Sequence, residues 1–359
     1  MGGAHSTDHS GGRRAYIGSF TSGGGRGITT AAVDPLTGAL TPLSATGALP
    51  DPSYLAFARD TGVLYAVSET EHGAVAAFTP TADGLAPLGA PVPVAASGPT
   101  HLGLAGGLLL TANYTSGSVS SLPLAADGSP AGPVRVLAHR GSGPDAERQE
   151  RPHAHQVLPD PSGRWVLVVD LGTDSVRVCA ADPATGELHP HSQTPLRPGA
   201  GPRHLAFHPD GEVVYVLHEL EPQLTVCRWS ASSGRLRPVR EVPVTSEGAP
   251  GAARAYPSAV VVSPDGRFVW AAIRGRDTIA TLSLAAGAGQ PQLTGVADCG
   301  GSWPRDLAAD PEGRRLYAAN ERSGDVTWFD VDPLTGHPRR AGSMAVPAAT
   351  CVVFGTARD

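Results

Sequence analysis

Residues 202–219 read PRHLAFHPDGEVVYVLHE, and this stretch contains the unit from which the fold is predicted. Pro202 opens a short apolar segment, the motif His208-Pro209-Asp210-Gly211 follows, and the β-branched segment Val213–Leu217 comes next. Proline presets φ and glycine takes the left-handed position, so the four-residue motif indicates a tight turn. The stretch therefore predicts two antiparallel strands, each of about five to seven residues, joined by that turn.

The same unit recurs along the chain. Its turn is repeated at 160–163, 263–266 and 310–313, and a second turn motif, Asp-Pro-x-Thr-Gly, stands at 34–38 and again at 182–186 and 332–336. Each copy starts nine residues before the turn glycine. When small changes in turn length are allowed, the seven starts are Pro52, Pro99, Ala154, Pro202, Pro257, Pro304 and Pro347. Their spacing of about 50 residues leaves room for four short strands, which is typical of a β-propeller.

The seven starts predict an all-β fold, a seven-bladed β-propeller with four antiparallel strands per blade. Only one strand, at 351–354, follows the last start, and the chain begins in the middle of a unit with Ala15–Gly18. We therefore expect strands from both termini to close the ring, which removes the exposed edges of an open array. One propeller domain is predicted over 14–359, after a disordered N-terminal tail over 1–13.

Composition limits the function classes. The 45 glycines and 34 prolines leave little room for long helices. A net charge of −6 argues against a nucleic-acid partner, and no apolar run is long enough to span a membrane. All 27 cationic residues are arginine, which excludes a catalytic lysine. Four widely spaced cysteines indicate free thiols in a cytoplasmic protein. No cofactor is predicted, and both a monomer and a homodimer are compatible with the sequence.

Equivalent positions of the units form rings around the central channel, and two of these rings are polar. The residue after each start is, in chain order, Ser53, Thr100, His155, Arg203, Ser258, Arg305 and Ala348. At the end of the next strand the series reads Glu69, Tyr114, Leu171, Glu219, Arg274 and Glu321, with Phe20 in the N-terminal copy. Because only 17% of the chain is charged, this clustering in register favours a functional site at the channel mouth. The alternative is that these charges are solvated or join neighbouring blades.

Histidines accompany the rings. His153 and His155 form a His-x-His pair, which places both side chains on one face of a regular strand. No third carboxylate ligand stands at a diagnostic spacing, so no metal is predicted. His101 and His204 are candidates for substrate binding or for packing.

Taken together, several segments resemble the seven-bladed lactonase family. That family includes propeller-type 6-phosphogluconolactonases and is related to the carboxymuconate cycloisomerases. The resemblance extends from about residue 14 onward and is strongest at Gly201–His204 and His218–Leu220. It is supported by 16–21, 52–55, 64–69, 112–114, 147–155 and 169–172. Ser68, His218 and Ile273 stand where the family often has asparagine, and Arg276 stands where histidine is frequent.

The resemblance implies a lactone hydrolase acting on a sugar-type lactone such as 6-phosphogluconolactone. It places His155, Arg203, Glu219 and Arg274 at the proposed catalytic positions. We expect Arg203 and Arg274 to stabilise an oxyanion, and either Glu219 or His155 to act as the general base. Arg305 is expected to hold a carboxylate or phosphate. The full set predicted to bind substrate is Glu69, His101, Tyr114, His153, Asp170, His204, Arg305 and Glu321.

Two other function classes stay open. A cyclase or cycloisomerase, of the muconate-lactonising type or in a specialised biosynthetic step, could use the same pocket without net hydrolysis. A non-catalytic propeller could serve as a binding platform, because fold alone does not select a function. The expected partner of an enzyme of either class is a small lactone or anionic substrate.

Overall fold

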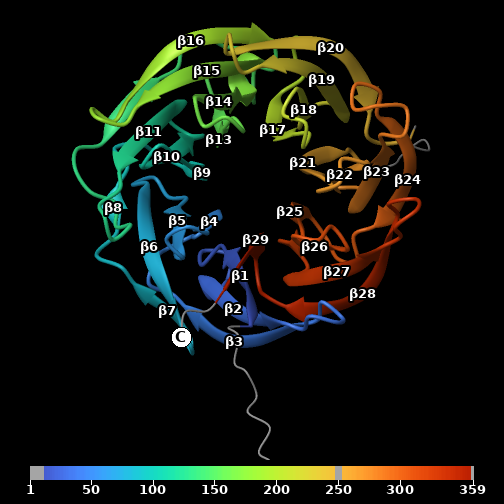
Figure 1. Cartoon of the computed structure of the whole chain (residues 1–359), viewed down its shortest axis with the longest axis horizontal. Helices are drawn as coiled ribbons and strands as arrows, with labels where there is room; N and C mark the ends of the chain where they lie inside the picture. The colour runs from blue at the N-terminus through green and yellow to red at the C-terminus, as the bar shows by residue number, and fades with distance from the viewer. Residues whose placement is uncertain (1–11, 247–252, 357–359) are drawn as a thin grey trace, which may run out of the picture.

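The computed structural model describes residues 12–246 and 253–356, and it shows seven four-stranded sheets arranged around a central axis (Figure 1). The predicted all-β, seven-bladed propeller is thus confirmed. The predicted N-terminal tail falls largely on residues 1–11, outside the described residues. Strand β1 begins at Arg13, one residue before the predicted start of the domain.

We number the blades along the chain and give their strands from the axis outward. Blade 1 contains β4 (Leu55–Ala58), β5 (Val63–Ser68), β6 (Ala74–Thr81) and β7 (Gly84–Pro87), with β8 (Val92–Pro93) beside β6. Blade 2 contains β9 (Pro99–Ala105), β10 (Leu108–Asn113), β11 (Ser118–Pro123) and β12 (Arg135–Ala138). Blade 3 contains β13 (Ala154–Pro159), β14 (Trp165–Asp170), the 3₁₀ turn η1 (Leu171–Thr173), β15 (Ser175–Asp182) and β16 (Glu187–Pro195).

Blades 4 to 7 complete the ring. Blade 4 contains β17 (Pro202–Phe207), β18 (Val213–His218), β19 (Gln223–Ser230) and β20 (Arg235–Pro243), and blade 5 contains β21 (Tyr256–Val262), β22 (Phe268–Arg274), β23 (Thr278–Ser283) and β24 (Gln292–Asp298). Blade 6 contains β25 (Pro304–Ala309), β26 (Arg315–Asn320), β27 (Asp325–Val331) and β28 (Pro338–Ala345). Blade 7 contains β29 (Ala349–Thr356), β1 (Arg13–Ser19), β2 (Ile28–Val33) and β3 (Leu40–Thr46).

The last blade is completed by both ends of the chain, as predicted. Strand β29 is its innermost strand and pairs antiparallel with β1, with Ala15 opposite Phe354 and Ile17 opposite Val352. Figure 1 shows β29 beside the axis, with β1 and β2 outside it. Because every inner strand has a neighbouring blade on each side, the ring has no open end.

The repeated glycines make the predicted turns. Gly211 has a φ of 74°, and its N–H donates to the carbonyl of His208 at 2.9 Å. The Asp-Pro-x-Thr-Gly motif closes in a similar way, with Gly38 at a φ of 69° and its N–H 2.8 Å from the carbonyl oxygen of Asp34. Both conformations favour glycine, which has no Cβ to clash.

The hydrophobic core is divided among the blade interfaces. The described residues form seven buried apolar clusters, and each cluster draws its members from two adjacent blades. Between blades 4 and 5, for example, Val213, Tyr215 and Leu217 pack with Val269 and Ala271. Apolar packing between blades therefore holds the inner strands in register and fixes the rings of side chains at the channel mouth.

Candidate active site

The predicted ring residues are positioned by a repeated irregularity of the inner strands. The register shifts between Pro202 and His204, so that Arg203 is an extra residue in the pairing of β17 with β18. The same shift leaves His155 in blade 3 and Arg305 in blade 6 without a partner residue on the neighbouring strand. A bulged residue is not bound in the ladder and can be aimed away from it. This explains why the residue after the start supplies ring side chains in blades 2, 3, 4 and 6. In blade 7 the shift leaves out Thr350 and not the predicted Ala348.

Three arginines converge on one buried carboxylate at the centre of the site. Oε2 of Glu219 lies 3.1 Å from Nε of Arg203 and 2.7 Å from Nη2 of Arg274. Its Oε1 accepts a hydrogen bond of 2.6 Å from Nη2 of Arg148. Arg203, Glu219 and Arg274 are buried, whereas the side chain of Arg148 is 35% exposed. The cluster holds three guanidinium groups against one carboxylate, so it carries an excess of positive charge.

Backbone carbonyls fix two of these arginines. Arg203 donates to the carbonyl of Ser258, and Arg274 donates to that of Tyr256 at 3.2 Å. The guanidinium of Arg274 also lies 5.4 Å from the ring centroid of Trp303. Donors held in this way need no rearrangement when a negative charge develops beside them.

The arginines determine the ionisation of Glu219. Burial alone would raise the pKa of this carboxyl, but Arg274, Arg203 and Arg148 outweigh burial and hold the pKa well below its ordinary value of 4.5. Burial, and then the proximity of Arg274, lower the pKa of Arg203, which Glu219 partly offsets. The carboxylate is therefore a weak proton acceptor. Its geometry is that of an anchor for the arginines.

Three histidines lie beside the arginine cluster along the channel. The ring centroids of His155 and His204 are 5.3 Å apart, and those of His204 and His101 are 5.5 Å apart. His101 also stacks on Tyr54 with a centroid distance of 4.0 Å. Burial and the charge of Arg203 lower the pKa of His101 to about 3, and they hold the pKa values of His155 and His204 well below the ordinary range. All three imidazoles are therefore neutral at pH 7, and Nδ1 of His155 has no hydrogen-bond partner in the part of the chain that the structure describes.

The other side of the mouth is formed by an acidic pair around Arg305. Its Nη1 donates to Glu321 at 3.1 Å and its Nη2 donates to Glu69 at 3.4 Å, and the guanidinium lies 4.8 Å from the ring centroid of Phe20. Glu69 also accepts from Thr100 at 3.4 Å. The predicted ring residues of blades 1, 2 and 6 are thus brought together, but Arg305 is already bracketed by two carboxylates.

Tyr114 and His153 form the wall on the side of blades 2 and 3. Their rings stack with a centroid distance of 4.5 Å, and His155 contacts Tyr114 edge-on at 5.5 Å. Tyr114 accepts a hydrogen bond of 3.1 Å from Arg148 through its hydroxyl oxygen. The bulge between Ala154 and Gln156 interrupts the alternation assumed for the His-x-His pair. In the part of the chain that the structure describes, no group of three or more His, Cys, Asp or Glu side chains is placed to hold a metal ion.

Asp170 has a different place from the one predicted. Its carboxylate is fully buried and caps η1 through the N–H of Thr173. It also accepts from the N–H of His153 at 2.9 Å and lies 2.6 Å from Nδ1 of His139. With no exposed surface and these partners, Asp170 is placed to support the wall.

Two residues of the site are not among those predicted from the sequence. Arg148 lies on the segment between β12 and β13, outside the repeating unit, although the segment itself was noted as part of the family resemblance. Trp303 precedes Pro304 and has a φ of 65°. Gly98 and Gly201 take the same conformation before the corresponding prolines. Blades 2 and 4 have glycine here, and a tryptophan with this positive φ indicates strain of about 1–3 kcal/mol at the site edge.

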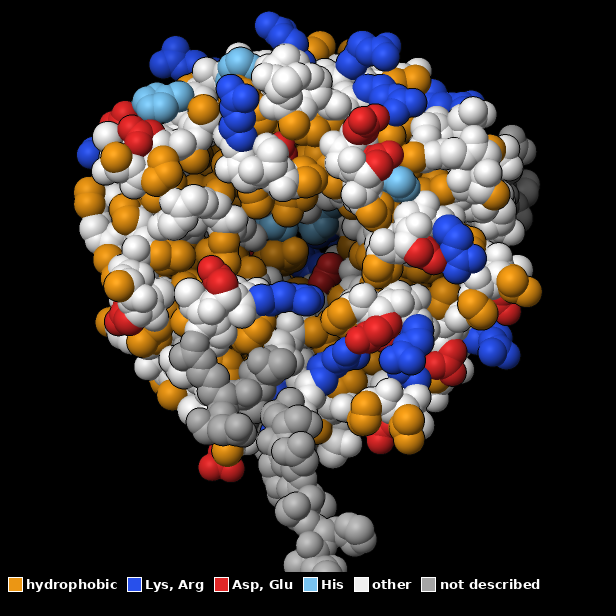
Figure 2. All heavy atoms as spheres, viewed as in Figure 1, with side chains coloured by type: hydrophobic (Ala, Val, Ile, Leu, Met, Phe, Trp, Pro, Cys, Tyr) orange, Lys and Arg blue, Asp and Glu red, His pale blue; other side chains and the backbone are white. Residues whose placement is uncertain are grey.

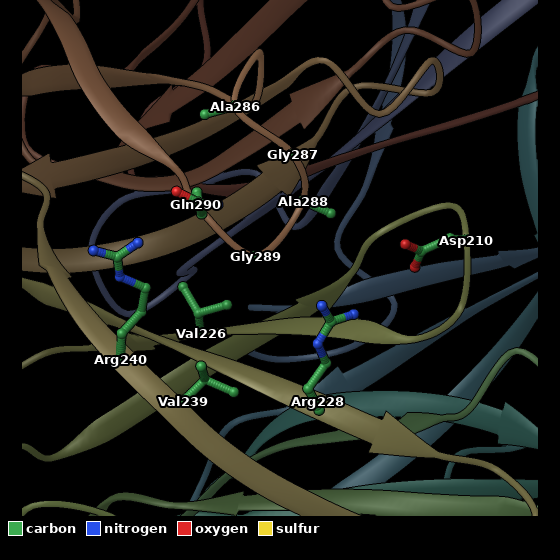
Figure 3. A pocket seen from close by; sticks show the side chains of 10 residues that line it. All are labelled: Asp210, Val226, Arg228, Val239, Arg240, Ala286, Gly287, Ala288, Gly289 and Gln290. Atoms are coloured by element: carbon green, nitrogen blue, oxygen red, sulfur yellow. The ribbon is translucent and has the colours of Figure 1, made fainter.

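In the space-filling view, the centre of the ring is hollowed, and histidine and acidic side chains are visible inside (Figure 2). A separate cleft of about 650 Å³ lies between blades 4 and 5. Figure 3 shows Arg228 and Arg240 beside Val226 and facing the segment 286–290. None of the predicted ring residues lines this cleft, so we place the candidate active site at the channel. No helix in the described residues is long and apolar enough to cross a membrane.

Known proteins of similar sequence and structure share this fold. The family model described as "Lactonase, 7-bladed beta-propeller" matches residues 14–354. A 6-phosphogluconolactonase of Bacillus subtilis is 34% identical over 346 residues, which are 94% of this chain and 97% of the relative. A periplasmic gluconolactonase of Pseudomonas aeruginosa has a similar structure, with a TM-score of 0.89, 30% identity, and coverage of 96% of this chain and 99% of that one. A Lactobacillus plantarum protein matches with a TM-score of 0.87 and 27% identity over 96% and 99% of the two chains.

Proposed function

This chain belongs to the seven-bladed β-propeller lactonase family, and we propose that it hydrolyses a phosphorylated sugar lactone of the 6-phosphogluconolactone type. The observation that carries the proposal is the convergence of Arg148, Arg203 and Arg274 on Glu219 at the channel mouth. The excess positive charge of this cluster suits both an anionic substrate and the oxyanion that forms when an ester carbonyl is attacked. The relatives described as 6-phosphogluconolactonase and gluconolactonase support the same substrate class.

Arg203 and Arg274 stabilise the transition state in this mechanism. Attack on the lactone carbonyl places a negative charge on its oxygen. Two buried guanidinium groups held by backbone carbonyls meet that charge without reorganising. Charge-assisted hydrogen bonds of this kind are about twice as strong as neutral ones.

His155 is the general base in our proposal. Burial and nearby arginines lower the pKa of His155, and arginines lower the pKa of Glu219, so the choice between them rests on geometry. Nδ1 of His155 has no hydrogen-bond partner among the described residues, whereas both carboxylate oxygens of Glu219 lie against arginines. The imidazole takes a proton from the attacking water, and the bond between the carbonyl carbon and the ring oxygen then breaks. The imidazolium returns the proton to the ring oxygen, and the new carboxylic acid releases its own proton to solvent. Glu219 acts by positioning the arginines.

The test is hydrolysis of 6-phosphogluconolactone, followed by acid release at constant pH after subtraction of spontaneous hydrolysis. We expect Arg203→Ala and His155→Gln each to lower kcat/KM at least about tenfold, which corresponds to ~1.4 kcal/mol. Arg228→Ala, in the distant cleft, is the control and should leave the rate unchanged. Unchanged rates in both site variants would contradict the assignment.

Product mass distinguishes the remaining function classes. Hydrolysis adds one water to the substrate, whereas a cyclase or cycloisomerase conserves its mass. A binding platform would give no turnover with any lactone.

A cytoplasmic location and a monomeric or homodimeric state also remain proposals. The four cysteines are buried and unpaired, as suits a reducing compartment, although the Pseudomonas neighbour is described as periplasmic. Cell fractionation and light scattering test the two points.

A further inference from the structure

We propose that Arg148 and Tyr114 form the subsite for the phosphoryl group of the substrate, an assignment that rests on the proposed lactonase function. Arg148 is the one member of the arginine cluster that lies partly in solvent, with a side chain that is 35% exposed. Both of its side-chain hydrogen bonds, to Glu219 and to the hydroxyl of Tyr114, use Nη2. Among the described residues, its Nη1 and Nε have no hydrogen-bond partner, so they are available to an incoming anion.

The segment that carries Arg148 is held rigidly at the mouth. Gln149 is fully buried, and its side-chain amide donates to the carbonyl of Leu171 and to the carboxylate of Asp174, both at 2.8 Å. The carboxylate of Asp145 accepts from the N–H of Arg148 at 3.1 Å. Arg148 is thus fixed over the cluster before a ligand arrives, which lowers the entropic cost of binding.

Tyr114 completes the subsite as a neutral donor. Burial raises the pKa of its phenol, against the effect of Arg148, so the hydroxyl keeps its proton at pH 7. The oxygen accepts from Arg148, which leaves the O–H free to donate. A phosphoryl group carries about −1.5 to −2 charges at neutral pH and offers three acceptor oxygens. An exposed guanidinium edge and a hydroxyl, set beside a cluster with excess positive charge, match that group.

This assignment replaces the prediction that Arg305 holds the anionic group of the substrate. Arg305 lies between Glu69 and Glu321, so the local charge around it is negative. A phosphate approaching Arg305 would also approach two carboxylates. Arg322 is a rival on charge alone, but its guanidinium stacks on Trp303, with Cζ 3.4 Å from the ring centroid, and no ion pair joins it to Glu219 among the described residues.

The experiment compares two substrates that differ only in the phosphate. The kcat/KM values for 6-phosphogluconolactone and for gluconolactone are measured in the wild type and in Arg148→Met, Arg148→Lys, Arg305→Met and Arg322→Met. Arg140→Met, an exposed residue of the same connecting segment, is the control. The ratio of interest is kcat/KM for 6-phosphogluconolactone divided by kcat/KM for gluconolactone. We expect Arg148→Met to lower this ratio by about 10–100-fold, the effect of one lost hydrogen bond to a charged group. Arg148→Lys should restore part of the ratio.

A ratio that is unchanged in Arg148→Met, or that falls only in Arg305→Met or Arg322→Met, overturns the subsite. Calorimetric titration with 6-phosphogluconate and gluconate separates this failure from failure of the proposed function. Preferential binding of 6-phosphogluconate that is lost in Arg148→Met, without turnover of either lactone, would keep the subsite and refute the hydrolase. Turnover of both lactones with no effect of Arg148→Met would do the reverse.

Discussion

Replacing Glu219 with glutamine tests the central feature of the site, a single carboxylate that anchors three arginines. The substitution keeps the shape of the side chain and removes its charge. Arg203 and Arg274 are buried, so they would then face each other without a counter-ion. Removing one partner from a buried ion pair destabilises a protein by about 3–5 kcal/mol. With 359 residues and an unfolding entropy of about 2.1 cal/mol/K per residue, this lowers Tm by about 4–7 °C.

Differential scanning calorimetry measures the effect, with Glu187→Gln as the matched control because Glu187 is exposed and has no ion pair among the described residues. Added phosphate should raise the Tm of Glu219→Gln more than that of the wild type, because an anion can replace the lost carboxylate. The pKa of Glu219 is lowered by folding, so its stabilisation is complete above 4.5 and is lost as the pH falls further. The Tm difference between wild type and variant should therefore shrink below pH 4.5. A Tm for Glu219→Gln that matches the control at pH 7 would refute this reasoning.

Three other predictions concern backbone strain, protonation and ring closure. At Trp303, whose φ is 65°, we expect the unfolding free energy of Trp303→Gly in urea denaturation to be about 1 kcal/mol higher than that of Trp303→Ala. A more stable alanine variant, which is the usual order, would contradict the strain. Folding lowers the pKa of His101 from 6.5 to about 3, so the unfolded state binds more protons below pH 6.5 and stability is lost as the pH falls. Between pH 6.5 and 4, the unfolding free energy of His101→Gln should therefore decline less steeply than that of the wild type. The two slopes should differ by up to about 1.4 kcal/mol per pH unit. Equal slopes would count against a buried neutral imidazole. At Gly18 a Cβ would lie 2.3 Å from the carbonyl oxygen of Pro52, so Gly18→Ala should lower the unfolding free energy by about 1–3 kcal/mol in urea denaturation. A variant as stable as the wild type would show that the closing blade tolerates more movement than the structure implies.

The repeat made the fold and part of the site predictable. Seven starts, four of them followed by the same turn, predicted the blade number, and the two incomplete copies at the ends predicted the closure. Because blades 2, 3, 4 and 6 place their bulge at the residue after the start, aligning the copies also found His155, Arg203 and Arg305. The charged rings were visible in the sequence because the fold repeats the same local geometry seven times.

What the repeat could not show lies outside the period or depends on contacts across the ring. Arg148 is on a connecting segment with no counterpart in other blades, so no alignment of copies points to it. Arg305 and Glu69 are 236 positions apart and meet only when the ring closes. The choice between Glu219 and His155 as the base depends on how many guanidinium groups reach one carboxylate, which spacing in the sequence does not reveal. The strain at Trp303 is a property of the backbone, and residue type alone gives no sign of it.

The pairing of β1 with β29 has a consequence for how the molecule is made. Among the described strands, β1 is synthesised first and its inner neighbour β29 last, so blade 7 lacks its innermost strand until residues 349–356 have been translated. During nearly the whole of synthesis, one edge of β1 is without its partner, and an unpaired edge is a template for wrong pairing. The six other blades contain only consecutive strands and can form in order as the chain emerges. The final strand thus sets the moment at which β1 gains its inner partner and the ring closes.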